Sequence, residues 1–333
     1  MTTKTRYFAI VSLLVLTVGL GTGLLAYYVG FSTSAFSRDQ QPDELKFVPP
    51  NATLVAYAEV RQIMTSPLRQ KLRTLIPDSG HGQQDFETQT GINIETDIDH
   101  VLATITEQRD PSGRLPGTAM VLARGRFDVV KIEGLMREHG GQVLDYKGTR
   151  MIDGDQAQGR PSLSLAFLEP GLIVVGSSNL VRMAVDLGQG GANVTSNSDL
   201  MNLIRDLDSG NAWAVGRFDV LASQAQLPSG VSQNLPAISL FSASANIDSG
   251  VSGIVRAEAR DEQAANSLRD VIRGVMALAK LQSNAYPQFQ GVLNSLQLGG
   301  TGKTVALSFD LPSEVFDVIG SRNSSRQSPA PVR

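Results

Sequence analysis

The chain of 333 residues contains no cysteine. This absence excludes disulfides, thiolate-ligated metal sites, a cysteine nucleophile and a lipid-modified N-terminal cysteine. Histidine is scarce, since His81, His100 and His139 are the only three, and none has another ligand type at metal-binding spacing. Serine hydrolase signatures of the G-x-S-x-G form are missing as well. We therefore predict no catalytic, metal-binding or cofactor-binding residue, and we favour a protein that is not an enzyme.

Dense runs of basic residues are also missing. The chain has 29 Lys and Arg against 32 Asp and Glu, and setting aside Lys4 and Arg6 leaves 27 against 32. Nucleic-acid binding needs clustered Lys and Arg to neutralise phosphates, so we exclude a nucleic-acid partner. Hydrophobic residues make up 41% of the chain, which is enough for a buried core.

The chain does contain one long hydrophobic run near its N-terminus, Tyr7 to Gly30, which has no charged residue. A helix needs about 20 apolar residues to cross the hydrocarbon core of a bilayer. We therefore predict a transmembrane helix over residues 7–30, in contact with the lipid bilayer. A cleaved signal peptide is the alternative, with Thr33 and Ala35 as the small residues of its site, although its apolar region would be shorter.

The charges beside this run favour one orientation. Lys4 and Arg6 flank its N-terminal side, whereas the first positive charges on the other side are Arg38 and Lys46. Positive residues concentrate on the cytoplasmic side. We expect a cytoplasmic N-terminus at residues 1–6 and a single-pass protein of the inner membrane, with its body in the periplasm or outside the cell.

The body is divided by composition. Residues 31–46 are polar and predict a flexible stalk, and residues 320–333 predict a disordered tail. Between them we predict two related α+β modules, 47–190 and 191–319, which separate in a Gly-rich stretch. Each has mainly antiparallel sheet with helices packed on one face, and the first module carries an extra hairpin at 142–152.

Hydrophobic periodicity supports this division. Alternating apolar and polar residues predict strands, and apolar spacing of i, i+4 and i+7 predicts a long helix at 261–282. The expected strands that run into helices are 53–59, 118–124, 212–215 and 253–260, and the expected hairpins are 163–175 and 296–311.

The pentapeptide GRFDV occurs twice, at 125–129 and 216–220, each time where a strand pattern meets a helix pattern. We interpret the repeat as a sign of duplication. Asp128 and Asp219 are then expected to be helix N-caps, which accept hydrogen bonds from free amides of the first turn. Paired catalytic acids are the alternative, but no neighbouring residue supports that role.

The run GGTGKT at 299–304 resembles the end of a phosphate-binding P-loop. That motif needs a glycine where Gln297 stands, and a helix after the loop, whereas TVALSFDL at 304–311 alternates like a strand. We therefore predict a hairpin turn and no nucleotide.

Two acidic groups could suggest calcium. Glu95, Asp97 and Asp99 lack the EF-hand pattern and its glycine, so we interpret them as acids of a turn or helix start. Asp153-Gly154-Asp155 similarly predicts a hairpin turn.

Five runs resemble a family of bacterial N-terminally anchored envelope proteins that carries a domain of unknown function. They are FVPPNATLVAYAEV (47–60), TGINIETDIDHVLAT (90–104), ARGRFDVVKIE (123–133), YKGTRMI (146–152) and LAFLEPGLIVVGS (165–177). The resemblance implies a bacterial envelope setting and supplies no activity or site residue.

These observations favour a membrane-anchored envelope protein that acts as a non-enzymatic binding or structural module. Its partner would be an envelope protein, a lipid or an envelope polymer. One alternative is an envelope hydrolase whose dispersed carboxylates converge in space. Another is an accessory subunit of a membrane complex, in which Gly19 and Gly23 contact a second helix.

Overall fold

The structure, a computed structural model, describes residues 41–75, 87–88, 90–106, 119–138, 140–154, 163–220, 237–282 and 290–316. The predicted anchor at 7–30, the predicted tail at 320–333, and His81 and His139 lie outside the described residues. Within them, no helix combines the length and the apolar character needed to cross a bilayer.

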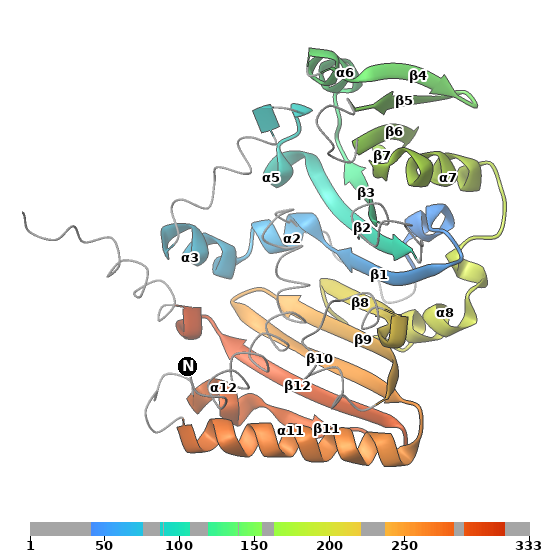
Figure 1. The fold of residues 1–333 in the computed structure, drawn as a ribbon. Coiled ribbons are helices and arrows are strands. Elements are labelled where there is room, and N and C mark those ends of the chain that lie inside the picture. Colours follow the sequence, from blue (N-terminus) through green and yellow to red (C-terminus); the bar gives the residue numbers. More distant parts are fainter. Residues whose placement is uncertain are drawn as a thin grey trace, which may run out of the picture.

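The described strands form one antiparallel sheet on which helices pack, which confirms the predicted α+β class and antiparallel pairing (Figure 1). The sheet has twelve strands in the order β11-β12-β10-β9-β8-β1-β2-β3-β7-β6-β5-β4. They are β1 (Ala52–Ala58), β2 (Ile98–Thr106), β3 (Ala119–Gly125), β4 (Gln142–Tyr146), β5 (Thr149–Asp153), β6 (Leu163–Glu169), β7 (Leu172–Ser177), β8 (Ala212–Arg217), β9 (Ile238–Ile247), β10 (Gly250–Ala259), β11 (Gln297–Gly299) and β12 (Thr304–Pro312).

The strand order reads alike in both directions from the middle of the sheet. From β1 outward it is β1-β2-β3-β7-β6, and from β8 outward it is β8-β9-β10-β12-β11. Strands β1 and β8 pair antiparallel, with Ala56 opposite Ala214. The two halves thus share a continuous sheet, and the hairpin of β4 and β5 extends only the first half.

The two GRFDV copies do not occupy equivalent places in this order. The first begins at the last residue of β3, the third strand outward from the middle, whereas the second begins near the end of β8, the first strand outward. Asp128 is a helix cap as predicted, because its Oδ1 accepts from the amide of Lys131 at 3.0 Å. Asp219 is not, because it lies within a helical stretch that begins at residue 218 and bonds to the adjacent Val220 amide.

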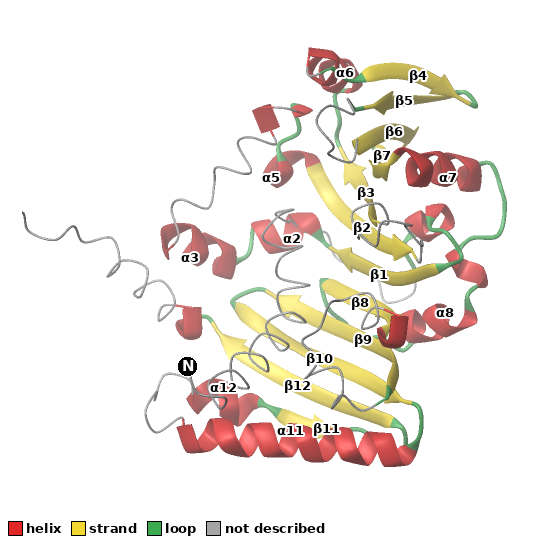
Figure 2. Cartoon of the chain, in the orientation of Figure 1, coloured by secondary structure: helices red, strands yellow, loops and turns green. Residues whose placement is uncertain are grey.

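Helices lie on both faces of the sheet, so the prediction that helices pack on one face is wrong (Figure 2). Adjacent strand residues point to opposite faces, and Val174 and Ile173 belong to two different buried clusters. One face, here the η1 face, is covered by η1 (Asp43–Phe47), α7 (Ser178–Gly188), η4 (Val194–Ser196) and α8 (Ser198–Arg205). The opposite face, here the α6 face, is covered by α2 (Val60–Met64), α5 (Ile94–Asp97), α6 (Val129–Glu138) and α11 (Glu262–Gln282). The remaining described helices are α3 (Pro67–Leu75) and α12 (Gln290–Ser295).

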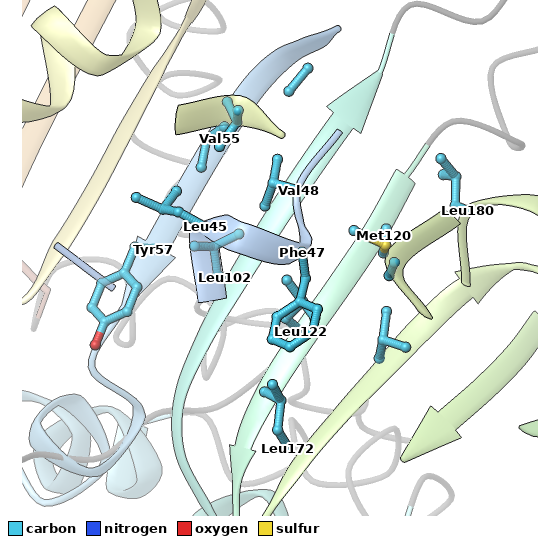
Figure 3. Close-up of a cluster of buried hydrophobic side chains, with 14 of the residues drawn as sticks. Leu45, Phe47, Val48, Val55, Tyr57, Leu102, Met120, Leu122, Leu172 and Leu180 are labelled. Atoms are coloured by element: carbon cyan, nitrogen blue, oxygen red, sulfur yellow. The ribbon is translucent and has the colours of Figure 1, made fainter. Parts of the chain in front are cut away.

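The first described helix, η1, belongs to the core. Leu45 and Phe47 are 2% exposed and pack with Val48 against Val55 and Leu122 of the sheet (Figure 3). Residues 43–46 were expected to end a flexible stalk, and the structure corrects this boundary. The physical reason is that the short sequence DELKF places three residues inward within one and a half turns of 3₁₀ helix.

The three predicted hairpins are confirmed, as β4 with β5, β6 with β7 and β11 with β12. The GGTGKT run joins β11 to β12, and Gly300 and Gly302 adopt positive φ values of 91° and 56°. Such backbone angles favour glycine, so the glycines of this run fit the turn between β11 and β12.

Candidate functional site

A chain of paired charges lies where η1 meets the sheet. Glu44 of η1 contacts His100 of β2 at 3.1 Å and also accepts a hydrogen bond from Nε of Arg124 on β3. Arg124 continues to Glu169 at the end of β6 at 3.2 Å, and Lys46 of η1 reaches the other oxygen of Glu169 at 2.6 Å. We call these five residues the ionic cluster. It ties η1 to three strands far apart in sequence.

Glu44 is the buried centre of the ionic cluster, with its side chain 3% exposed. Burial by itself would raise the pKa of Glu44, but hydrogen bonds from His100 and Arg124 and the charge of His100 outweigh it and lower the pKa to about 2. Burial would lower the pKa of Arg124, and Glu44 and Glu169 outweigh it and raise that pKa. At neutral pH Glu44 is therefore a charged acceptor held by its partners.

An aromatic group borders the ionic cluster on the η1 face. The ring of Tyr57 stacks on Trp213 with centroids 5.6 Å apart and lies 5.4 Å from the ring of His100. Its hydroxyl donates to Glu59 at 2.7 Å. Burial raises the pKa of Tyr57 far above its ordinary value, and the carboxylates of Glu59 and Glu44 add to this, so the phenol remains a proton-bearing donor.

The replacement Tyr57→Phe tests this bond. The ring stack persists, but the hydrogen bond to a buried carboxylate is lost, so we expect the free energy of unfolding to fall by about 1.5–3 kcal/mol. Chemical denaturation followed by fluorescence of Trp213, the only tryptophan, measures it. The matched control is Tyr146→Phe, because that hydroxyl lies 3.3 Å from Asp186, whose side chain is 43% exposed. Equal losses in both variants would contradict the assigned role of Tyr57.

The ionic cluster is better suited to holding η1 against the sheet than to proton transfer. A general base works best with a pKa near the operating pH, and the pKa of Glu44 has moved away from it. The described residues contain no group of three or more His, Cys, Asp or Glu side chains placed to hold a metal ion.

Two of the three clustered acids that the sequence singled out, Glu95 and Asp99, pair with arginines of neighbouring helices. Glu95 contacts Arg69 at 3.2 Å and Asp99 pairs with Arg61, while Asp97 accepts from the amide of Asn93 at 2.8 Å. They therefore stabilise the contact of α2, α3 and α5 with β2. Asp153 ends β5, and its carboxylate bonds to Ser164 and Arg182. Asp155, the last residue of the predicted turn, lies outside the described residues.

Sequence reasoning placed no importance on Glu44, Arg124 or Glu169. One signal was available, because Arg124 follows Met120 and Leu122 at inward positions of the same strand. A charge at an inward position implies a buried partner. The identity of that partner depended on η1, which sequence composition had assigned to the stalk.

A small hollow lies near Glu169, where the turn between β6 and β7 meets the residues that follow β3. It has a volume of about 300 Å³ and a mainly apolar lining from Phe127, Val129, Phe167, Leu168, Glu169, Pro170, Gly171, Leu172 and Ile173. This volume is at the lower limit of pockets that enclose small molecules.

Comparison with known proteins adds a distant structural likeness. No protein-family model matches the chain, and no curated protein matches its sequence. Among solved structures the chain is similar to "Structure of crystal form I of TP0453", with a TM-score of 0.44 and 11% identity over 84% of this chain and 98% of that chain. At this TM-score and identity, the likeness indicates neither a family nor a function.

Proposed function

We propose that the protein is a single-pass envelope protein whose anchor, residues 7–30, holds a non-enzymatic binding or structural body outside the cytoplasm. One observation carries this proposal. The segment that emerges from the predicted anchor enters the body through η1, and η1 is fixed in the sheet by the ionic cluster and by Leu45, Phe47 and Val48.

This attachment suits a tethered body for a mechanical reason. An anchored domain is positioned by the place where its tether enters the fold, and here the tether enters near the middle of a twelve-stranded sheet. The entry point bonds to β2, β3 and β6 at once, so displacement of η1 would break several buried contacts together. Such an attachment fixes the place at which the tether leaves the sheet.

We further propose that the two halves of the sheet are related modules, here joined through β1 and β8. The support is the equal strand order outward from that pair. The body then offers two similar platforms on one rigid sheet, which suits binding an extended envelope protein or polymer.

Membrane fractionation tests the anchor. We expect the full chain to sediment with membranes and to resist extraction by alkaline carbonate, because an uncharged run of 24 residues spans the bilayer. Deletion of residues 7–30 should release the protein into the supernatant, and the emission of Trp213 should still report a folded body.

Two further outcomes separate location from function. An alkaline phosphatase fusion at the C-terminus should be active, since that reporter folds outside the cytoplasm, and an inactive fusion on a stable protein would overturn the orientation. Full-length protein that stays in the supernatant with residues 1–30 intact would contradict the anchor itself.

A further inference from the structure

Helix α11 has apolar side chains that the sheet does not bury. The described residues have six large exposed apolar side chains, and three of them lie on α11: Val271 at 51%, Leu278 at 50% and Leu281 at 74% exposed. Elsewhere on helices such side chains occur singly, as Val130 on α6 and Met183 on α7. Exposed apolar residues that occur singly are ordinary, whereas a group on one helix indicates a contact surface.

The spacing of these residues places them along one line. Residues advance by about 100° each around an α-helix, so positions 271, 274, 278 and 281 fall in one sector. We call Val271, Gly274, Leu278 and Leu281 the α11 stripe. Leu268 and Ile272 point in a different direction, into the cluster with Val305 that joins α11 to the sheet.

Helix α11 is consequently three-sided. One side packs on the sheet, the second is the α11 stripe, and the third carries charge. Arg273 and Lys280 belong to the charged side, and the side chain of Arg273 is 65% exposed. Asp270, which pairs with Arg273 at 3.0 Å, lies at the border between this side and the α11 stripe. An apolar sector beside a charged sector is typical of helices that lie in the interface of a bilayer.

We propose that the α11 stripe contacts the surface of the bilayer in which the protein is anchored. This inference rests on the proposed function. Twelve residues separate Gly30 from Asp43, and their extended length is at most about 40 Å. Helix η1 bonds to β2 and β3 on the face opposite α11, and β11, over which α11 lies (Figure 1), is six strands from β2. This is a distance of about 29 Å along the sheet at ordinary strand spacing, which is shorter than the extended tether. The tether therefore lets α11 reach the membrane.

The size of the α11 stripe favours lipid over a second copy of the chain. Stable protein interfaces bury about 1,200–2,000 Å² in total. Three side chains on one helix bury much less area than this. A short apolar contact is weak for a free protein. It becomes effective when an anchor holds the helix beside the membrane, since tethering raises the effective concentration.

Site-directed fluorescence tests this contact in the full chain. Because the protein has no cysteine, single-cysteine variants accept a label at one position only. Leu278→Cys and Leu281→Cys carry an environment-sensitive fluorophore, and Arg273→Cys, on the charged side of α11, is the matched control. The labelled proteins are reconstituted into vesicles of phosphatidylethanolamine and phosphatidylglycerol with a quencher on the acyl chains.

We expect a blue-shifted emission and strong quenching by the acyl-chain quencher at positions 278 and 281, and neither at position 273. Equal emission and equal quenching at all three positions, in protein that carbonate extraction shows to be anchored, would overturn the inference and leave the proposed function standing. Energy transfer between labelled copies that rises with protein density, without lipid quenching, would also overturn it, because the α11 stripe would then contact a second copy. Protein that fails the carbonate test would instead contradict the anchor.

Discussion

Acidification from pH 4.5 to pH 2 is expected to remove about 3 kcal/mol of unfolding free energy through Glu44 alone. The pKa of Glu44 falls from 4.5 to about 2 on folding. A group with a depressed folded pKa binds protons more readily in the unfolded chain, so its contribution is complete above the unfolded pKa. The contribution is then lost as the pH falls toward the folded pKa. More than half of this loss is reached by about pH 3.

The variant Glu44→Gln isolates this contribution. At neutral pH we expect Glu44→Gln to unfold with about 3–5 kcal/mol less free energy, because it leaves Arg124 and His100 beside an uncharged group in a buried place. Denaturation at a series of pH values should show the difference between the parent and Glu44→Gln shrinking by about 3 kcal/mol toward pH 2. Carboxylates outside the ionic cluster titrate alike in both proteins and cancel in this difference.

The control for Glu44→Gln is Asp270→Asn on α11. Asp270 also pairs with an arginine, Arg273 at 3.0 Å, but its side chain is 74% exposed. Exposed pairs contribute little, so its effect should stay below about 1 kcal/mol at every pH. A difference between the parent and Glu44→Gln that stays constant from pH 4.5 to pH 2 would refute the assignment of Glu44.

The fold was accessible from sequence wherever local pattern and pairing agree. Alternation in β12 and the Gly-rich run before it specified a hairpin, because the turn residues and the strand residues are neighbours in the chain. The long helix α11 was equally accessible from its repeated apolar positions, and Asp261 caps it by accepting from the amide of Ala264 at 2.8 Å.

The continuity of the sheet was not accessible, because it depends on pairing between distant segments. Strand β1 pairs with both β2 and β8, and β8 lies more than 150 residues from β1 in sequence. Periodicity states which residues face inward on a strand but not which strand lies beside it. The second covered face was missed for a different reason, because Ile173 and Val174 are both apolar and a continuous apolar run conceals alternation.

The ionic cluster was inaccessible for a related reason. Its five residues come from η1, β2, β3 and the end of β6, and no spacing rule joins them. Within η1, Glu44 and Lys46 read as surface charges of a polar segment, and only the burial of Leu45 and Phe47 turns Glu44 inward.

The replacement Gly125→Ala is expected to lower the free energy of unfolding by about 3–5 kcal/mol or to prevent folding. This is the largest effect that we predict for the addition of one methyl group in the described residues. A Cβ at Gly125 would lie 1.9 Å from the carbonyl oxygen of Asp97 and 2.9 Å from Cα of Ile98. Both neighbours are backbone, so no side chain can rotate away. Separating β3 from β2 here would also shift Arg124, the adjacent residue, away from Glu44.

Gly134→Ala is the matched control for Gly125→Ala. Gly134 lies on the exposed side of α6 with no atom within 4 Å of an added Cβ. Alanine is the better helix former, so this variant should gain about 0.5–1 kcal/mol. Thermal and chemical denaturation of both variants measures the contrast, and a Gly125→Ala protein as stable as its parent would show that β2 and β3 do not approach this closely.

The glycine of the second GRFDV copy also has neighbouring atoms close to the position of an added Cβ, although less close than at Gly125. A Cβ at Gly216 would lie 2.7 Å from the carbonyl oxygen of Thr53 and 2.8 Å from the ring of Phe241. An aromatic ring can move aside more easily than a backbone. We therefore expect Gly216→Ala to lose less unfolding free energy than Gly125→Ala, and denaturation of the two variants measures the difference. The two glycines would then share one role, because each lets a strand end approach a neighbouring carbonyl closely. Their two strands hold non-equivalent places in the sheet order.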